Sequence, residues 1–207
     1  MSRQKLLEMQ MQSKQVEELI LQSLEHELGG VKVYETALSC AQNAGLKSEW
    51  QKYLTETKIH VTTLTDVCNA LGIDAARETP GRQVVRLVGG ALVEAMKLAL
   101  SAGDPAAAEL VACECVVLAE TKDHADWQLI GKCAEHADGD VGNALKAAYD
   151  VVEDQEDEHL YHTKGWCREL WLQSLGIPAV LPPPEEKRHV KTAIGAAKAE
   201  QAAEKER

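Results

Sequence analysis

The sequence predicts an all-α protein in which four long helices pack as two antiparallel pairs, with a shorter crossover helix between the pairs. Apolar residues recur at spacings of three and four along most of the chain, and no segment alternates in the manner of a strand. Aromatic residues make up only 4% of the 207 residues, and phenylalanine is absent. Because strands favour aromatic and β-branched side chains, this composition favours helices.

The first antiparallel pair is expected from residues 3–43 and 47–71. The adjacent glycines Gly29 and Gly30 would each weaken the first helix by about 1 kcal/mol relative to alanine, so we expect a close helix contact or a kink there. The turn between the two helices is short, which makes them antiparallel neighbours. Gly72 is a typical C-terminal stop for the second helix.

The crossover helix is expected over residues 82–101, after a linker at 72–81. Thr79 and Pro80 supply an N-cap and a first-turn proline. The segment is rich in apolar residues, which are Val84, Val85, Leu87, Val88, Leu92, Met96 and Leu100.

The second antiparallel pair begins at Asp104-Pro105, where an aspartate N-cap is again followed by proline. This helix is expected to continue to about residue 136, and Asp138-Gly139-Asp140 interrupts the pattern. The last long helix is expected over 141–174. The pattern therefore predicts a helical bundle over residues 1–176.

Residues 177–207 are expected to lie outside this bundle. Three consecutive prolines, Pro182 to Pro184, break the helical pattern, and residues 185–207 are rich in Lys, Glu and Ala without an apolar stripe. We therefore expect a solvated or disordered tail after the Pro-rich break, helical at most transiently.

The charge and composition of the chain indicate which kinds of binding partner to expect. The net charge of −11 argues against nucleic acid or an anionic membrane as the main partner and is compatible with a cation site. No run of about 20 apolar residues is present. The polar N-terminus lacks the apolar core of a secretory signal, and the six cysteines form no C-x-x-C pair, so we expect reduced thiols in a cytoplasmic protein.

Several acids and histidines fall on the apolar stripes of the predicted helices. A carboxylate in an apolar core needs a partner or a metal ion, so these positions are candidate ligands. Spacings of three and four residues place two such side chains on one helix face. Carboxylates and imidazoles in this arrangement suit a dinuclear iron or manganese site. The candidates are Glu27 in the first helix, Glu56 and His60 in the second, Glu120 and His124 in the third long helix, and Glu156 and His159 in the last.

The spacing alone is a weak signal in a Glu-rich helical chain. Glu158 with His162 and Glu185 with His189 show the same spacing, and the second of these pairs lies in the polar tail. What favours the metal site is that three pairs fall on apolar stripes at similar depths in three helices. The alternative remains that the glutamates are solvated edge residues and that the histidines form hydrogen bonds within the core.

The chain resembles the ferritin-like superfamily, and most nearly the bacterial ferritin-like stress proteins, with rubrerythrins and manganese catalases more distant. The resemblance covers about residues 15–175. It depends on HELGGVKVYETAL in the first helix, YLTETKIHVTTL in the second, LAETKDHADW in the third long helix and EDQEDEHLYH in the last. It implies a ferritin-like four-helix bundle with two iron or manganese ions bound by these helices.

The resemblance also implies redox chemistry at that centre, namely ferrous oxidation, peroxide removal or oxygen activation, and the protein would then be an oxidoreductase linked to oxidative stress. Two departures leave a second class open. The second helix has Glu-x-x-x-His where the family has Glu-x-x-His, and His124 follows Glu120 where the family has no histidine. The alternative is a metal-free, vestigial bundle that acts as a structural or interaction protein. We expect a homodimer in either case.

Overall fold

The computed structural model describes residues 3–207, with side chains from Lys14 onward except that of Glu206. Every regular element in this range is a helix, which confirms the all-α prediction. The helices are α1 (Arg3–Cys40), α2 (Ala44–Leu71), α3 (Pro80–Ser101), α4 (Pro105–His136), α5 (Gly139–Ser174), α6 (Pro184–Lys187) and α7 (Ala193–Glu206).

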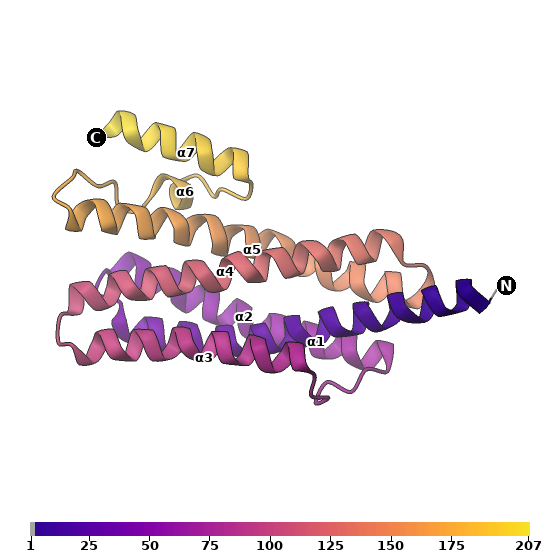
Figure 1. The fold of residues 1–207 in the computed structure, drawn as a ribbon. Coiled ribbons are helices and arrows are strands. Elements are labelled where there is room, and N and C mark those ends of the chain that lie inside the picture. Colours follow the sequence, from indigo (N-terminus) through magenta and orange to yellow (C-terminus); the bar gives the residue numbers. More distant parts are fainter. Residues whose placement is uncertain (1–2) are drawn as a thin grey trace.

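Four of the five long helices enclose a common core. Helix α1 packs against α2 and α4, and α5 packs against the same two helices (Figure 1). Short turns join α1 to α2 and α4 to α5, so each of these pairs is antiparallel, as predicted. Helix α3 runs back along the length of the bundle and packs on α1 and α4. The crossover therefore returns the chain to the end from which α2 began.

Capping residues mark the helix ends, and Thr79, Asp104 and Gly72 among them were predicted. Asn43 accepts hydrogen bonds from the backbone of Gly45 and Leu46 at the start of α2. Thr79 caps α3 and Asp104 caps α4, each directly before a proline. Gly72 ends α2 with a φ of 68°, a conformation that glycine adopts without strain.

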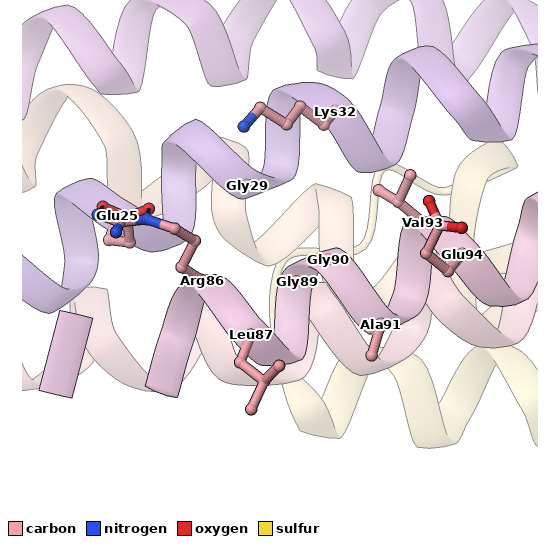
Figure 2. Close-up of a pocket in the computed structure, with 10 residues that line it drawn as sticks. All are labelled: Glu25, Gly29, Lys32, Arg86, Leu87, Gly89, Gly90, Ala91, Val93 and Glu94. Atoms are coloured by element: carbon pink, nitrogen blue, oxygen red, sulfur yellow. Dashed lines mark hydrogen bonds and ion pairs between the residues drawn. The ribbon is translucent and has the colours of Figure 1, made fainter. Parts of the chain in front are cut away.

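The glycine pair of α1 lies where neighbouring helices approach closely. A Cβ atom on Gly30 would lie 3.3 Å from the Thr57 side chain of α2, and one on Gly89 of α3 would lie 3.8 Å from the Cα of Gly29. Helix α1 continues through both glycines, and a close helix contact of the predicted kind is present there. A groove of about 450 Å³ runs over this contact, with Glu25 and Arg86 at one end and Glu94 at the other (Figure 2).

A buried ion cluster fixes the crossover to α1. Glu25 Oε2 accepts hydrogen bonds from Arg82 Nε and Nη2 at 3.1 and 2.8 Å, and Glu25 Oε1 accepts one from Arg86 Nε at 2.7 Å. The Nη1 atom of Arg82 also donates to the carbonyls of Ala75 and Arg77 in the linker. Both Glu25 and Arg82 are buried. One acid therefore holds the linker and the start of α3 against the bundle.

Part of the apolar surface of α3 faces outward. Leu87 and Leu98 are 73% and 72% exposed, and Val84 and Val88 are also exposed. Val85 and Met96, by contrast, are buried against the bundle. The expected homodimer remains a prediction.

The core of the bundle consists of two apolar clusters. One surrounds Tyr34, Trp50 and Trp166, and the other surrounds Leu24 and Trp127. On each of the four core helices, the stretch between the two clusters carries buried polar side chains. This polar layer in the middle of the bundle contains most of the candidate ligands.

The C-terminal segment differs from the predicted disordered tail. It contains α6 and α7, which pack on each other and on α5. Ala199 and Ala203 of α7 are fully buried, and Glu185 pairs with Arg168 of α5 at 2.7 Å. Alanine is a small apolar residue, so its buried stripe in α7 gives little sequence signal.

Two further observations concern the whole described chain. None of the helices that the model describes is long and apolar enough to cross a membrane. All six cysteines are free, and four of them are buried, as expected for reduced thiols.

Candidate metal centre

The polar layer brings together side chains from all four core helices. Helix α1 supplies Glu27, α2 supplies His60, α4 supplies Glu120, and α5 supplies Glu156 and His159. Each of these five side chains is at most 3% exposed. A carboxylate at such depth is costly unless cations or protons neutralise it, so the cluster requires an explanation in terms of binding or charge pairing.

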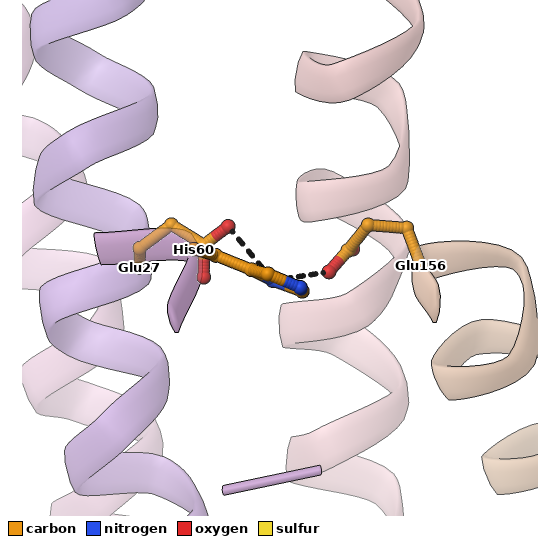
Figure 3. A group of neighbouring side chains, drawn as sticks. All are labelled: Glu27, His60 and Glu156. Atoms are coloured by element: carbon orange, nitrogen blue, oxygen red, sulfur yellow. Dashed lines mark ion pairs between the residues drawn. The ribbon is translucent and has the colours of Figure 1, made fainter. Parts of the chain in front are cut away.

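One half of the cluster joins α1, α2 and α5 (Figure 3). His60 Nδ1 lies 3.4 Å from Glu27 Oε1 and 3.0 Å from Glu156 Oε1. One ligand atom from each of these three residues falls within 4.8 Å of the others. The three side chains converge on one point from three helices, as the ligands of a metal ion do.

The other half joins α4 to α5. His159 Nδ1 lies 3.6 Å from Glu120 Oε2 and 3.5 Å from Glu156 Oε1. These three residues also offer ligand atoms within 4.8 Å of one another. The second group therefore repeats the composition of the first, with two glutamates and one histidine.

Glu156 belongs to both groups. Both of its carboxylate oxygens are buried without a hydrogen-bond partner. The Nδ1 atoms of His60 and His159 and one oxygen each of Glu27 and Glu120 are buried in the same condition. Native proteins leave few buried polar atoms without a partner, and so many at one place indicate a ligand.

The outer nitrogen of each imidazole is held by a neighbouring helix. His60 Nε2 lies 2.8 Å from Gln155 Oε1, and His159 Nε2 lies 2.9 Å from Glu56 Oε2. These contacts orient both rings with Nδ1 toward the centre. Outer partners of this kind set the tautomer and the direction of a metal-binding histidine.

Two aromatic side chains hold the outer carboxylates. Trp127 Nε1 donates a hydrogen bond to Glu27 Oε1 at 2.7 Å, and the Tyr34 hydroxyl donates one to Glu120 Oε1 at 2.8 Å. In each carboxylate the second oxygen is left free for another contact. The ring of Tyr53 lies 4.2 Å from that of His159, centroid to centroid, and shields this side of the centre from solvent.

Asp123 is a further buried acid that the sequence analysis did not single out. It is 4% exposed, and its Oδ1 atom has no hydrogen-bond partner. Burial, together with the charges of Glu156, Glu27 and Glu120, raises its pKa well above the usual range. Burial and the neighbouring acids therefore both favour the neutral form of Asp123. The sequence feature that could have identified Asp123 is its position three residues after Glu120, because this spacing places both side chains on one face of α4.

In the centre, two imidazoles lie beside buried glutamates, which raise the pKa of both histidines. Burial would lower the pKa of His60, but Glu27 and Glu156 outweigh burial and raise it to about 11. Glu120, Glu56 and Glu156 similarly raise the pKa of His159 to about 9 against the effect of burial. Both imidazoles therefore carry protons at neutral pH in the metal-free protein.

The central carboxyl group behaves differently. Burial raises the pKa of Glu156 to about 7, with Glu120 and Glu27 adding to the effect and His60 and His159 opposing it. The group is thus readily ionised by a cation that approaches it. The acids of the site repel one another, and protons on the imidazoles and on Glu156 reduce this repulsion. A bound cation would replace those protons.

The predicted ligands do not all reach the centre. Five of the seven do, and Glu56 contacts only the outer nitrogen of His159. His124 lies apart, with its Nδ1 atom 3.4 Å from Asp157 Oδ1 and its Nε2 atom 2.8 Å from the amide nitrogen of Gln128. Burial and the charge of Lys164 lower the pKa of His124. The sequence analysis missed Gln155 and Trp127 because neither is a residue type that ligates these metals.

Comparisons with protein-family models, curated proteins and solved structures give no match to this chain. A function can therefore be inferred only from the chemistry of the side chains.

The donor set fits iron or manganese. It consists of carboxylate oxygens and imidazole nitrogens, without a thiolate, and each of its five residues has at least one buried polar atom without a hydrogen-bond partner. Oxygen and imidazole ligands suit Fe and Mn, whereas thiolates favour softer ions. Three glutamates and two histidines offer enough donors for two ions with one shared carboxylate.

Proposed function

We propose that this protein is a dinuclear iron or manganese carboxylate protein of the ferritin-like type. Glu27 and His60 would hold one ion, Glu120 and His159 the other, and Glu156 would bridge them. One observation carries the proposal. Glu156 lies between two Glu–His pairs, and both of its buried carboxylate oxygens lack a hydrogen-bond partner.

The helix arrangement supports the same proposal. Two antiparallel pairs joined by one long crossover are the ferritin-like way to build a bundle, and such bundles hold two metal ions between facing helices. Helices α1, α2, α4 and α5 have these connections, with α3 as the crossover. The proposed ligands come from all four helices at the middle of their length.

The activity we propose is redox chemistry with ferrous ions, peroxide or oxygen as substrate, in the context of oxidative stress. The two ions would supply the electrons when bound. The chain's own side chains bind and orient the ions and exclude water. Tyr34 and Trp127 fix the outer carboxylates by hydrogen bonds, and Tyr53 covers His159.

The site departs from a symmetric dinuclear centre at one position. Thr57 stands three residues before His60, where a second bridging glutamate would be expected, while Glu156 stands three residues before His159. Thr57 is buried, and its hydroxyl donates to the Tyr53 carbonyl. The proposed centre therefore has one bridging carboxylate.

A second candidate function has one observation in its favour. The imidazoles already lie 3.0–3.6 Å from the central carboxylates, so protonated histidines pair with these acids without any metal. In that case the cluster is a buried ion-pair network, and the bundle is a structural or interaction protein. Metal content distinguishes the two candidates.

The deciding experiment is elemental analysis by plasma mass spectrometry. Tag-free protein, purified without chelators and loaded anaerobically with ferrous or manganous ions, should contain about two ions per chain. The Glu156→Gln variant should lose most of this metal, whereas Glu135→Gln, an exposed α4 glutamate paired with Lys132, should retain it. Substoichiometric metal that is equal in all three proteins would favour the ion-pair network.

A further inference from the structure

A small cavity lies between α4 and α5, and Glu156 of the candidate centre is one of the residues that line it. Its volume is about 70 Å³. His124, Gln128, Glu153 and Asp157 are among the residues that line it, together with Glu156. Gln128 and Glu153 are exposed, whereas Glu156 is 1% exposed. The lining thus includes exposed side chains together with the buried residue that both ligand groups share.

The side chains of this cavity suit a hydrated cation. Glu153 and Asp157 contribute acidic residues to its lining, and His124 offers an imidazole whose Nδ1 atom lies 3.4 Å from Asp157 Oδ1. Clefts lined by one sign of charge concentrate ions of the opposite sign and raise their rates of association. Imidazole and carboxylate are also the donors used in the centre itself.

The inner end supplies an independent indication of a ligand. Both oxygens of Glu156 are buried and lack a hydrogen-bond partner, and Glu156 lines the cavity. The same cavity is therefore lined by Asp157 and His124 and by a buried acid that belongs to both ligand groups.

We propose that this cavity is the route by which divalent cations enter the centre, with His124 and Asp157 as transient ligands on the way. This inference rests on the proposed function, because it assigns an entry path to that metal centre. It also gives His124 a role outside the final ligand set.

The test measures the rate of cation uptake separately from the amount bound. Metal-free protein is mixed with Co²⁺ in a stopped-flow instrument, and the visible absorbance of the bound ion is followed. The variants are His124→Ala and Asp157→Asn. The control is Asp154→Asn, which removes the same charge from the outer face of α5, where Asp154 pairs with Lys191.

We expect both cavity variants to bind about two Co²⁺ per chain, as the wild type does, but about tenfold more slowly. Asp157→Asn removes a charge that attracts the ion, and His124→Ala removes a transient ligand. Release of the ions to a chelator should slow by a similar factor, since an entry route lowers the barrier in both directions. Asp154→Asn should match the wild type, and circular dichroism would verify that all variants are folded.

The outcomes separate the two claims. Full loading at wild-type rates in both cavity variants would overturn the entry route and leave the metal centre intact. Loss of stoichiometry in a folded cavity variant would also overturn it, by showing that the residue is a ligand of the final site. Failure of the wild type to bind Co²⁺ would overturn the centre and its route together.

Discussion

The Nδ1 atom of His60 lies 3.0 Å from Oε1 of Glu156, and both atoms are buried. The two residues come from α2 and α5, and both are buried in the middle of the bundle. This contact is the point at which one proposed ion position meets the shared carboxylate.

Removal of His60 should empty one of the two ion positions. We expect His60→Ala to bind about one manganese ion per chain where the wild type binds about two, because the Glu120, Glu156 and His159 group stays complete. Elemental analysis of manganese-loaded protein measures this. His136→Ala, which alters an exposed histidine at the end of α4, is the control and should bind as the wild type does. Two ions in His60→Ala would exclude His60 as a ligand.

Metal binding should stabilise the folded protein. A ligand at 100 times its dissociation constant stabilises the state that binds it by about 2.7 kcal/mol. For a chain of this size that corresponds to an increase in Tm of about 5–10 °C. Thermal unfolding followed by circular dichroism, with and without Mn²⁺, tests this expectation. An equal increase in Tm for Glu156→Gln would show that Mn²⁺ acts elsewhere on the protein.

Cations should displace protons from the centre. The pKa of His60 is raised to about 11 and that of His159 to about 9, so both imidazoles are protonated at pH 7, whereas metal ligation requires their neutral form. We therefore expect the release of about two or more protons per chain, and an affinity for Mn²⁺ that rises with pH between about 6 and 8. Calorimetry in buffers of different ionisation enthalpy counts these protons. A pH-independent affinity without proton release would contradict this expectation.

The ion cluster that fixes α3 should affect stability without affecting metal content. Arg86 and Arg82 lower the pKa of Glu25 although burial acts in the opposite direction. In Glu25→Gln the buried guanidinium of Arg82 loses its carboxylate partner, so we expect a loss of about 2–4 kcal/mol in the free energy of unfolding. Urea denaturation measures this loss. Metal stoichiometry should remain that of the wild type, and a loss of metal would show that α3 helps to form the centre.

The helices were predictable because their ends carry local signals. Thr79-Pro80, Asp104-Pro105 and Gly72 begin or end helices through contacts with adjacent residues, and the structure confirms each of them. Helix α7 was missed because its buried face consists of alanines, such as Ala199, which do not stand out from its polar neighbours.

The centre was only partly predictable because ligand choice depends on the rotation of each helix. One residue corresponds to about 100° around the axis, so a spacing of four places Glu56 and His60 about 40° apart, and both were predicted as ligands. The packing of α2 against α5 points His60 at the centre and places Glu56 behind His159. Whether Asp123 and Gln155 face the centre depends on the same packing. The sequence pattern of one helix does not reveal how that helix packs against the others.

The most direct test of the account is a crystal structure of the manganese-loaded protein with an anomalous difference map recorded above the manganese absorption edge. The account predicts two peaks in the middle of the bundle, one contacting Glu27 and His60 and the other contacting Glu120 and His159, with Glu156 contacting both. A map without a peak among these five side chains, from crystals grown with saturating Mn²⁺, would contradict it.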